Sequence, residues 1–214
     1  DGKWHRMCIY KKDGEDIILG DSFVSRKDRI IASAIEIISE SGLSALTTKN
    51  LALKENMSEA LLYKYFGGID EVLVEVVDTY SKFDKQIRQT VQGKDASNIE
   101  KLMDYLDAYA TYYDNYYALS SLMLQYEELL HNTATREIVL KGIQNRKVQL
   151  ADLFQEAIDN GEVITRFSSE QLGDTVQGMI MVYSLNRRIE LHKGTFKTEL
   201  CAHVNQWLSM IKMK

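Results

Sequence analysis

The 214-residue sequence contains no proline, and this absence restricts its fold more than any other single feature. Proline and glycine mark tight turns and the ends of strands, and this chain has only 12 glycines, whereas leucine, isoleucine, alanine, glutamate and lysine are plentiful. Such a sequence favours long helices over many short strands. We therefore expect an all-α fold, and a chain of this length can form one or two domains with a sizeable core.

The cysteine content and the apolar runs indicate a cytoplasmic protein without a membrane segment. Cys8 and Cys201 are too few for a disulfide scaffold or a four-thiolate zinc site. The first twenty residues lack the apolar core of a signal peptide. Purely apolar runs contain only a few residues, whereas a membrane span needs roughly 20.

Residues 1–21 form a leader that differs from the rest of the chain. Asp13-Gly14 lies between the β-prone runs Cys8–Tyr10 and Ile17–Leu19, and this pattern predicts a β-hairpin. A lone hairpin is marginal in water, so it must pack on the rest of the chain, pair with another chain or stay mobile. The sequence begins with Asp1, and Met7 follows closely, so part of this leader could be removed by processing or be artificial. We assign it no function.

Helical periodicity begins after the leader. The first stripe predicts a helix that ends at Ser41-Gly42, and its apolar residues are Ile30, Ala34, Ile37 and Ile38. Asp70 and Glu71 open a longer helix, because carboxylates favour the positive end of the helix dipole. Beyond a polar break, the pattern predicts helices near residues 99–114, 116–131, 134–160, 169–190 and 196–212.

Two short helices near residues 48–65 have the spacing of a helix-turn-helix. Thr47 and Thr48 are candidate N-caps of the first helix, and Ser58 begins the second. Such a motif requires a small residue where the helices cross, a residue tolerant of positive φ in the turn, and apolar residues that hold the crossing angle. At positions five, nine, ten and fifteen, counted from Thr48, the chain has Ala52, Asn56, Met57 and Leu62.

This segment resembles the tetracycline-repressor (TetR) family of bacterial transcriptional regulators over about residues 27–75. The resemblance is carried by Ile30-Ile31-Ala32, Ser41-Gly42-Leu43, Leu46-Thr47-Thr48, Leu51-Ala52, Met57-Ser58 and Leu62-Tyr63-Lys64-Tyr65-Phe66. It implies a homodimer of all-α subunits. Each would have an N-terminal three-helix helix-turn-helix DNA-binding domain at residues 22–68 and a C-terminal helical bundle for ligand binding and dimerisation at residues 69–214.

The resemblance also implies that the second short helix enters the major groove of a palindromic operator. The implied DNA-contacting residues are Thr48, Lys49, Ser58, Glu59, Ala60, Leu61, Tyr63, Lys64 and Tyr65. The chemistry is suitable, because Glu59 can accept from cytosine N4, Leu61 can touch a thymine methyl, and Lys64 can reach guanine or phosphate. Ile69 stands where the family often has a lysine, which removes one expected phosphate contact.

The charge distribution leaves an alternative open. The formal net charge of −5 argues against a protein covered by nucleic acid. Residues 22–68 contain six Lys or Arg and five Asp or Glu, so this segment is only slightly basic. With Glu55 and Glu59 nearby, we expect weak non-specific DNA affinity. The alternative is a dimeric ligand-binding or protein-interaction protein that keeps the fold but has weak or lost DNA binding.

Tyrosines gather between residues 105 and 126, and Tyr105, Tyr109, Tyr112 and Tyr116 fall at helical spacing on one stripe. Ordinary core packing is one interpretation, although a purely structural core would use more leucine and phenylalanine, because buried phenols need hydrogen-bond partners. Since the resembled family has a cavity in this bundle, we predict a pocket for a flat or elongated apolar effector with a few polar groups. Its predicted lining is Tyr105, Tyr109, Tyr112, Tyr113, Tyr116, Met123 and Tyr126.

The last two helices each carry an apolar stripe, and Gly173 and Gly178 permit close helix approach. In a monomer these stripes would be core, whereas the resemblance implies a four-helix bundle between two subunits. The predicted interface residues are Val176, Met179, Ile180, Tyr183, Leu200, Val204, Trp207, Leu208 and Ile211. A two-fold dimer suits DNA reading, because paired recognition helices must lie about 34 Å apart.

Catalysis finds little support in the sequence. The four histidines have no short metal-ligand spacing, and we find neither a glycine-rich phosphate loop nor a nucleophile elbow. We expect no enzymatic activity, no cofactor and no metal. The resemblance implies a dimeric, ligand-responsive repressor, with an activator as the alternative that the sequence does not separate.

Overall fold

The computed structural model describes residues 9–12, 15–18, 25–191 and 193–212. From the N-terminus, the elements are β1 (Ile9–Lys12), β2 (Glu15–Ile18), α1 (Arg26–Ser41), the 3-10 helix η1 (Leu43–Ala45), α2 (Thr48–Lys54), α3 (Glu59–Leu62) and α4 (Ile69–Gln92). They continue with α5 (Asn98–Asn115), the 3-10 helix η2 (Tyr117–Leu119), α6 (Ser120–Leu124), α7 (Tyr126–His131), α8 (Arg136–Asp159), α9 (Ser169–Arg188) and α10 (Phe196–Leu208). The all-α prediction is confirmed for the body of the chain.

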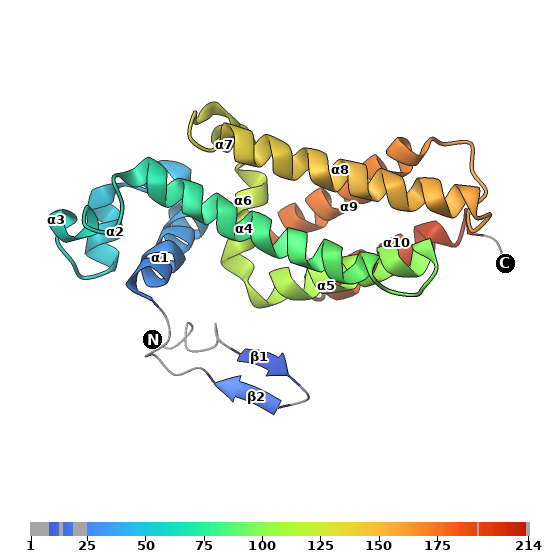
Figure 1. Ribbon diagram of the computed structural model, residues 1–214, viewed down its shortest axis with the longest axis horizontal. Helices are drawn as coiled ribbons and strands as arrows, with labels where there is room; N and C mark the ends of the chain where they lie inside the picture. Colours follow the sequence, from blue (N-terminus) through green and yellow to red (C-terminus); the bar gives the residue numbers. More distant parts are fainter. Residues whose placement is uncertain (1–8, 13–14, 19–24, 192, 213–214) are drawn as a thin grey trace.

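Strands β1 and β2 pair antiparallel in the segment where the sequence predicts a hairpin. Ile9 lies opposite Ile18, and Lys12 lies opposite Glu15. The Asp13-Gly14 dipeptide between the strands lies outside the described residues. The pair is drawn below the helices in Figure 1.

Helices α1, α2 and α3 gather at one end of the molecule, and α4 runs from there into a larger bundle formed with α5 to α10 (Figure 1). The small end has its own apolar contacts, because Ile30 and Ile38 of α1, Leu51 of α2 and Leu62 of α3 are all buried. In the larger bundle, α8 packs along α9, and α10 packs against α5 and α9. Helix α4 contacts α1, α5 and α8, so it belongs to both parts.

The stretch predicted as one helix at residues 116–131 is divided into η2, α6 and α7, so that prediction is wrong. The hydroxyls of Ser120 and Ser121 donate to the carbonyls of Tyr117 and Ala118, each at 2.7 Å. Serine side chains that bond to the local backbone compete with a continuous helix. This side of the larger bundle is therefore formed by three short helical segments rather than by one continuous helix.

Helix α1 touches the larger bundle directly, because it packs against η2 and α6 as well as against α4. Arg188, at the end of α9, donates to the carbonyl and, at 2.9 Å, to the hydroxyl of Ser39 on α1. The guanidinium groups of Arg187 and Arg188 lie 4.7 and 4.8 Å from the ring centre of Tyr117. Packed side chains and hydrogen bonds therefore connect α1 directly to η2, α6 and the end of α9.

Within the described residues, no helix combines the length and the apolar character that crossing a membrane requires.

Candidate nucleic-acid interface and buried tyrosine cluster

The turn between α2 and α3 has the geometry that the sequence predicts. Asn56 adopts φ of +54°, in the left-handed region that asparagine tolerates better than most residues. The amide of Met57 donates to the carbonyl of Ala52 at 2.9 Å, and the amide of Asn56 donates to the carbonyl of Leu53 at 3.1 Å. This pair of bonds is the Schellman arrangement, which satisfies carbonyls at the end of a helix. The role predicted for Asn56 is confirmed.

Both short helices begin at hydroxyl caps. The Thr47 side chain accepts a hydrogen bond from the amide of Asn50 at 3.1 Å, so Thr47 rather than Thr48 caps α2. The Ser58 side chain accepts from the amide of Leu61 at 3.2 Å. These bonds satisfy amides of the first helical turn and fix where each helix starts.

Helix α3 is shorter than the predicted span of residues 58–65. Its regular part is Glu59–Leu62, and the chain then continues in tighter turns, with the amide of Tyr65 donating to the carbonyl of Leu62 at 2.9 Å. Bonds of this i to i+3 type are usual at helix ends. The amide of Phe66 donates to the same Leu62 carbonyl at 3.1 Å, and the centre of the buried Phe66 ring lies 4.9 Å from the Nζ of Lys27 on α1.

Burial at the crossing explains why the two helices hold one angle. Ala52 is 3% exposed and Leu62 is 2% exposed, so the small residue of α2 lies at the contact and the leucine of α3 fills the core. Met57 is partly buried against the same core. A larger side chain at Ala52 would separate the helices.

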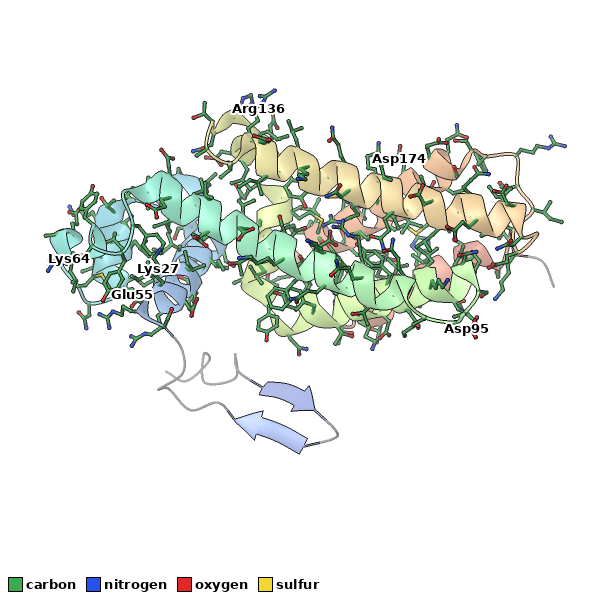
Figure 2. All side chains as sticks on the ribbon, in the orientation of Figure 1. Lys27, Glu55, Lys64, Asp95, Arg136 and Asp174 are labelled. Carbon is green, nitrogen blue, oxygen red and sulfur yellow. The ribbon has the colours of Figure 1, made fainter. Side chains whose placement is uncertain are left out.

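Most of the predicted DNA-contacting residues lie at the surface. Those that are exposed are Lys49, Ser58, Glu59, Ala60, Tyr63 and Lys64. Thr48, Leu61 and Tyr65 are half-buried, so each presents only part of its side chain. Figure 2 shows Lys64 at the extremity of the small end, pointing away from the bundle. The structure therefore brings this set onto one accessible end of the molecule.

One hydrogen bond joins the first turns of the two helices. The Thr48 hydroxyl donates to the Glu59 carboxylate at 2.6 Å. Both residues are predicted DNA contacts, and in this structure they bind each other. The bond sets the spacing between the N-termini of α2 and α3, and it leaves one carboxylate oxygen of Glu59 free to accept.

Several cations of the small end are already engaged. Lys54 lies 2.9 Å from the Glu36 carboxylate and 3.4 Å from that of Glu40. Arg29 lies 3.8 Å from the Glu55 carboxylate. Across the residues that the structure describes, Lys49 and Lys64 form no ion pair. These two lysines are therefore available for an anionic partner.

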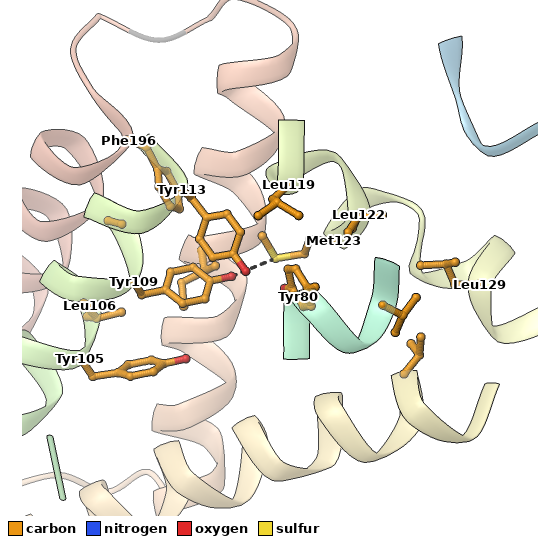
Figure 3. Close-up of a cluster of buried hydrophobic side chains, with 14 of the residues drawn as sticks. Tyr80, Tyr105, Leu106, Tyr109, Tyr113, Leu119, Leu122, Met123, Leu129 and Phe196 are labelled. Atoms are coloured by element: carbon orange, nitrogen blue, oxygen red, sulfur yellow. Dashed lines mark hydrogen bonds between the residues drawn. The ribbon is translucent and has the colours of Figure 1, made fainter. Parts of the chain in front are cut away.

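The larger bundle contains the tyrosine cluster that the sequence predicts. Its inward-facing tyrosines pack against one another in the interior instead of lining an open pocket. Tyr105, Tyr109 and Tyr113 of α5 are at most 1% exposed, and their rings follow one another with centroid distances of 5.8 and 4.5 Å. The Tyr109 hydroxyl points to the Met123 sulfur at 3.8 Å (Figure 3). Tyr126 also belongs to this cluster, because its hydroxyl lies 2.7 Å from that of Tyr80 on α4.

Tyr112 and Tyr116 do not share that interior. The Tyr112 ring stacks on Phe83 of α4 at a centroid distance of 4.3 Å, and the Tyr116 ring lies 4.7 Å from that of Tyr112. Both tyrosines are half-buried. The predicted single stripe was wrong in detail, because the inward-facing tyrosines are 105, 109 and 113, and the other two cover the outer junction of α4 and α5.

A buried ion pair at the centre of the bundle was missed by the sequence analysis. Arg146 of α8 is 2% exposed and Asp84 of α4 is 3% exposed, and the Arg146 Nε lies 3.6 Å from the Asp84 Oδ1. Arg88 lies 3.1 Å from the other Asp84 oxygen, and the Tyr105 hydroxyl donates to Asp84 at 3.0 Å. The signal was present, because Arg146 and Asp84 each interrupt an otherwise apolar helical stripe.

Arg146 also meets the tyrosines. Its Nη2 donates to the Tyr80 hydroxyl at 3.1 Å, and its Nη1 donates to the Tyr126 hydroxyl at 3.4 Å. The guanidinium lies 5.3 Å from the centre of the Tyr109 ring, within the range of a cation–π contact. We name the following set the arginine–tyrosine cluster: Tyr80, Asp84, Arg88, Tyr105, Tyr109, Tyr113, Tyr126 and Arg146.

The environment fixes the protonation of this cluster. Burial raises the pKa of Tyr80, Tyr105 and Tyr109, so these phenols stay neutral and can donate hydrogen bonds at neutral pH. Burial by itself would lower the pKa of Arg146, but the surrounding phenol oxygens and Asp84 outweigh it, and the pKa of the guanidinium is raised. Arg146 is therefore a permanent buried cation.

Little open space adjoins the cluster. A cavity of about 10 Å³ lies between α4, α6, α7 and α8, and Tyr80 and Tyr126 are among its lining residues. This volume holds one water molecule at most. Of the seven residues predicted to line a pocket, Tyr126 lines this cavity. A wider groove of about 300 Å³ lies between α5 and α10, with Glu100, Asp104 and Lys212 at its edge.

Five residues predicted at a dimer interface are buried inside the chain itself. Val176, Ile180, Leu200, Val204 and Leu208 are at most 1% exposed, so they have no surface to offer a partner and the prediction is wrong for them. Their stripes face α8, α5 and each other. Helical periodicity identifies an apolar stripe but not what covers it. Met179, Tyr183, Trp207 and Ile211 keep partial exposure.

The outward side of α9 carries a second apolar face. Val182, Leu185 and Ile189 are 54%, 44% and 52% exposed. Gly178 precedes Val182 by one turn, and a Cβ added there would meet no atom within 4 Å. Gly173 differs, because its added Cβ would lie 3.2 Å from the backbone of Ala151, so this glycine serves the packing of α9 on α8.

Across the described ranges, no group of three or more His, Cys, Asp or Glu side chains is placed to hold a metal ion.

Comparisons with known proteins agree with the arrangement of the small end. Residues 30–76 match the family model for bacterial regulatory proteins of the tetR family. The chain is 27% identical over 125 residues to the HTH-type transcriptional regulator HbdR of Aromatoleum sp. (strain CIB), covering 56% of this chain and 52% of that protein. It is 28% identical over 143 residues to the probable HTH-type transcriptional regulator YttP of Bacillus subtilis (strain 168), covering 65% and 66%. The chain thus spans about half to two thirds of these relatives.

The fold extends to solved structures over most of the chain. The ketosteroid transcriptional regulator KstR2 of Mycobacterium tuberculosis matches with a TM-score of 0.78, covering 89% of this chain and 96% of that one. The sequence identity is 14%, so this match shows a shared fold.

Proposed function

We propose that this chain, which belongs to the TetR family of bacterial transcriptional regulators, acts as a homodimeric repressor that leaves its operator when a small molecule binds the larger bundle. In this proposal, residues 22–68 are the DNA-binding domain and residues 69–214 bind ligand and form the dimer. The observation that carries the proposal is the capped α2–α3 pair, which presents Tyr63 and Lys64 at an exposed end.

The DNA contacts follow from what that end exposes. Lys64 is exposed in the turn directly after α3, where it can reach a guanine edge or a phosphate. Tyr63 is 54% exposed, and its hydroxyl can donate a hydrogen bond to a phosphate of the DNA backbone. Lys49, in the first turn of α2, can neutralise a phosphate because no ion pair in the described chain occupies it.

Dimerisation would use the outward face of α9. The exposed apolar side chains of Val182, Leu185 and Ile189 lie at helical spacing, and Gly178 allows close approach of a second helix. A two-fold interface brings the same face of both subunits together. It would also set the separation of two α3 helices, which must match successive major grooves about 34 Å apart.

Replacing Val182 with glutamate is expected to convert the dimer into a monomer. A two-fold interface would bury two unpaired carboxylates near each other, and burial of unpaired charge is unfavourable. Sedimentation velocity at matched protein concentrations measures the change. The control is Val148→Glu on α8, a valine that is 58% exposed in this structure and outside the proposed interface. If V182E sediments as wild type does, the outward face of α9 is not the interface.

Release of DNA would depend on two alternative positions of the DNA-binding domain relative to the larger bundle. Ligand in the larger bundle favours one arrangement in which the two α3 helices are wrongly spaced, and the change in operator affinity cannot exceed the difference in ligand affinity. Helix α4 spans both parts, and α1 also packs on η2 and α6. The bonds from Arg188 to Ser39 provide a second link between the parts.

The proposal is tested by selecting bound sequences from a random pool of duplexes with the purified protein. Enrichment of a palindrome by wild type is the expected result, because a two-fold dimer reads two half-sites. Absence of enrichment at low salt contradicts DNA reading. An enriched palindrome also supplies the operator for the experiments below, and a reporter behind the native promoter in a deletion strain separates a repressor from an activator.

A second candidate is a dimeric ligand-binding or interaction protein that no longer reads DNA. The specific observation that favours it is the Thr48–Glu59 bond, which engages two of the residues expected at DNA. The salt dependence of binding separates the candidates, because neutralising phosphates releases counterions and lost DNA binding shows no such slope.

Replacing Lys49 with alanine is expected to reduce the magnitude of the slope of log K against log salt by about 0.9, the value for one phosphate contact on duplex DNA. Fluorescence anisotropy with the selected operator at several salt concentrations measures it. Lys85→Ala removes the same charge from an exposed position of α4, in the bundle, and should leave the slope unchanged. Equal slopes for wild type and K49A would remove Lys49 from the interface.

A further inference from the structure

The arginine–tyrosine cluster contains more positive than negative charge. Asp84 is the one carboxylate within 4 Å of either Arg88 or Arg146 in the described chain, and it is shared between them. Arg88 retains some contact with solvent, because 14% of its side chain is exposed, whereas Arg146 retains almost none. Isolated buried charges are costly. Because Arg146 shares its one carboxylate partner with Arg88, its positive charge is only partly balanced, and an anion would bind there favourably.

The donors of Arg146 are also underused. A guanidinium has five N–H donors, and the two hydrogen bonds from Arg146 reach neutral phenol oxygens. Its Nε has no hydrogen-bond acceptor among the residues that the structure describes. A carboxylate can accept two parallel bonds from such a group, and charge-assisted bonds of this kind are stronger than bonds to phenols.

Other buried polar atoms near the cluster lack partners. Gln149 follows Arg146 by one helical turn and is 5% exposed, and within the described ranges neither its amide oxygen nor its amide nitrogen is hydrogen-bonded. The Tyr113 hydroxyl is also unpaired, and its ring lies 4.5 Å from that of Tyr109, which packs under the Arg146 guanidinium. Buried polar groups are normally satisfied, so these orphans point to a polar ligand.

The small cavity shows where the rest of such a ligand would lie. Gly142 precedes Arg146 by one turn of α8, and an added Cβ there would lie 3.8 Å from the Ser81 hydroxyl of α4. The cavity beside it is walled mainly by apolar side chains, namely Val77, Leu122, Leu129, Val139 and Ile143. Two of the helices that line the cavity, α6 and α7, belong to the divided segment η2–α6–α7. This segment also contacts α1, through η2 and α6.

We propose that Arg146 is the headgroup site for an acidic effector. A carboxylate attached to an apolar body replaces Asp84 as the partner of Arg146, and the body occupies the space between α4 and α8 beside Gly142. Displacement of α6 and α7 makes the room, and their contacts carry the change to α1. This inference rests on the proposed function, because it names the chemical class of the effector.

The test compares acids with their neutral amides. Purified wild-type protein is titrated with 2-naphthoate and decanoate and with 2-naphthamide and decanamide, and binding is followed by calorimetry and by the thermal midpoint. We expect at least one acid to bind and to raise the midpoint, with its amide at least about tenfold weaker, a difference of 1.4 kcal/mol. The proposal is wrong if neither acid binds or if the amides bind as well as the acids.

The decisive variant is Asp84→Asn. It removes the internal competitor and leaves Arg146 without a charged partner, so we expect the acid that binds wild type to bind at least about tenfold more tightly and to raise the midpoint of D84N further. Asp107→Asn is the matched control, because Asp107 is an exposed α5 carboxylate paired with Lys197. Unchanged affinity in D84N would overturn the proposal. If D84N does not fold, the acid and amide comparison in wild type still decides.

Failure of this inference can be distinguished from failure of the proposed function. Operator binding is measured on the same wild-type preparation without any carboxylate. A palindrome that is bound, together with no response to the acids, contradicts the acidic effector alone. Binding of an acid by a protein that selects no DNA contradicts the repressor alone.

Discussion

Replacing Arg146 with methionine is expected to lower the free energy of unfolding by about 3 to 5 kcal/mol, the usual cost of removing one partner from a buried ion pair. Methionine keeps most of the side-chain volume, so the loss reports charge rather than packing. Asp84 would remain 3% exposed in the bundle, with Arg88 as its one cation in the described part of the chain. Denaturant unfolding followed by circular dichroism at a fixed protein concentration measures the change.

Two further variants control this result. Arg136→Met, at the exposed start of the same helix, should change stability by no more than about 0.5 kcal/mol. The double variant Arg146→Met with Asp84→Asn should cost less than the sum of the two single changes, because neither charge is then left alone. Additive costs would show that Arg146 and Asp84 do not interact.

Replacing Tyr63 and Lys64 together with alanine is expected to weaken operator binding about 100-fold or more. Each good base contact contributes about 1 to 3 kcal/mol, and this double variant would remove one cation and one hydroxyl donor from the recognition surface. Both side chains are exposed, so the fold should be retained. Fluorescence anisotropy with the selected operator measures the loss, and the thermal midpoint verifies folding.

Lys54→Ala is the matched control for that double variant. It removes one positive charge from the same end of the molecule, but Lys54 is already paired with Glu36 and Glu40. We expect a change in operator affinity of less than about threefold, because the group contributes little free charge. Equal losses in K54A and in the double variant would mean that net charge, rather than the α3 surface, determines binding.

The helix-turn-helix could be predicted residue by residue because its determinants are local. A hydroxyl cap acts on amides two or three residues away, and the αL residue acts on carbonyls of the helix that it ends. Ser58 and Asn56 perform these roles in the structure as predicted. Thr47 and Thr48 could both serve as a cap, and only the folded backbone selects Thr47.

The interior of the bundle could be predicted only in part. The tyrosines of α5 were expected to be clustered and are, but their periodicity did not reveal that Tyr112 faces Phe83 of α4 rather than the interior. The cation that organises the cluster comes from α8, 37 residues further along the chain than Tyr109. No spacing rule connects them, because the contact depends on how α5 and α8 are placed in space.

The interface prediction was wrong for five of its nine residues for the same physical reason. An apolar stripe on a helix states that one face must be covered, and Val176 and Ile180 are covered by their own chain. The apolar face that α9 leaves exposed is the weaker one, which carries Val182 and Leu185.

The sequence by itself determined the all-α class, most helix boundaries and the capped turn at Asn56, because helix propensity, capping and left-handed backbone preference depend on near neighbours. The tertiary structure decided which stripe of α9 remains exposed, which tyrosines meet, and that Arg146 and Asp84 share one buried site. Those outcomes depend on packing between helices far apart in the chain, and burial decides whether a charge is a solvated surface group or the centre of a site.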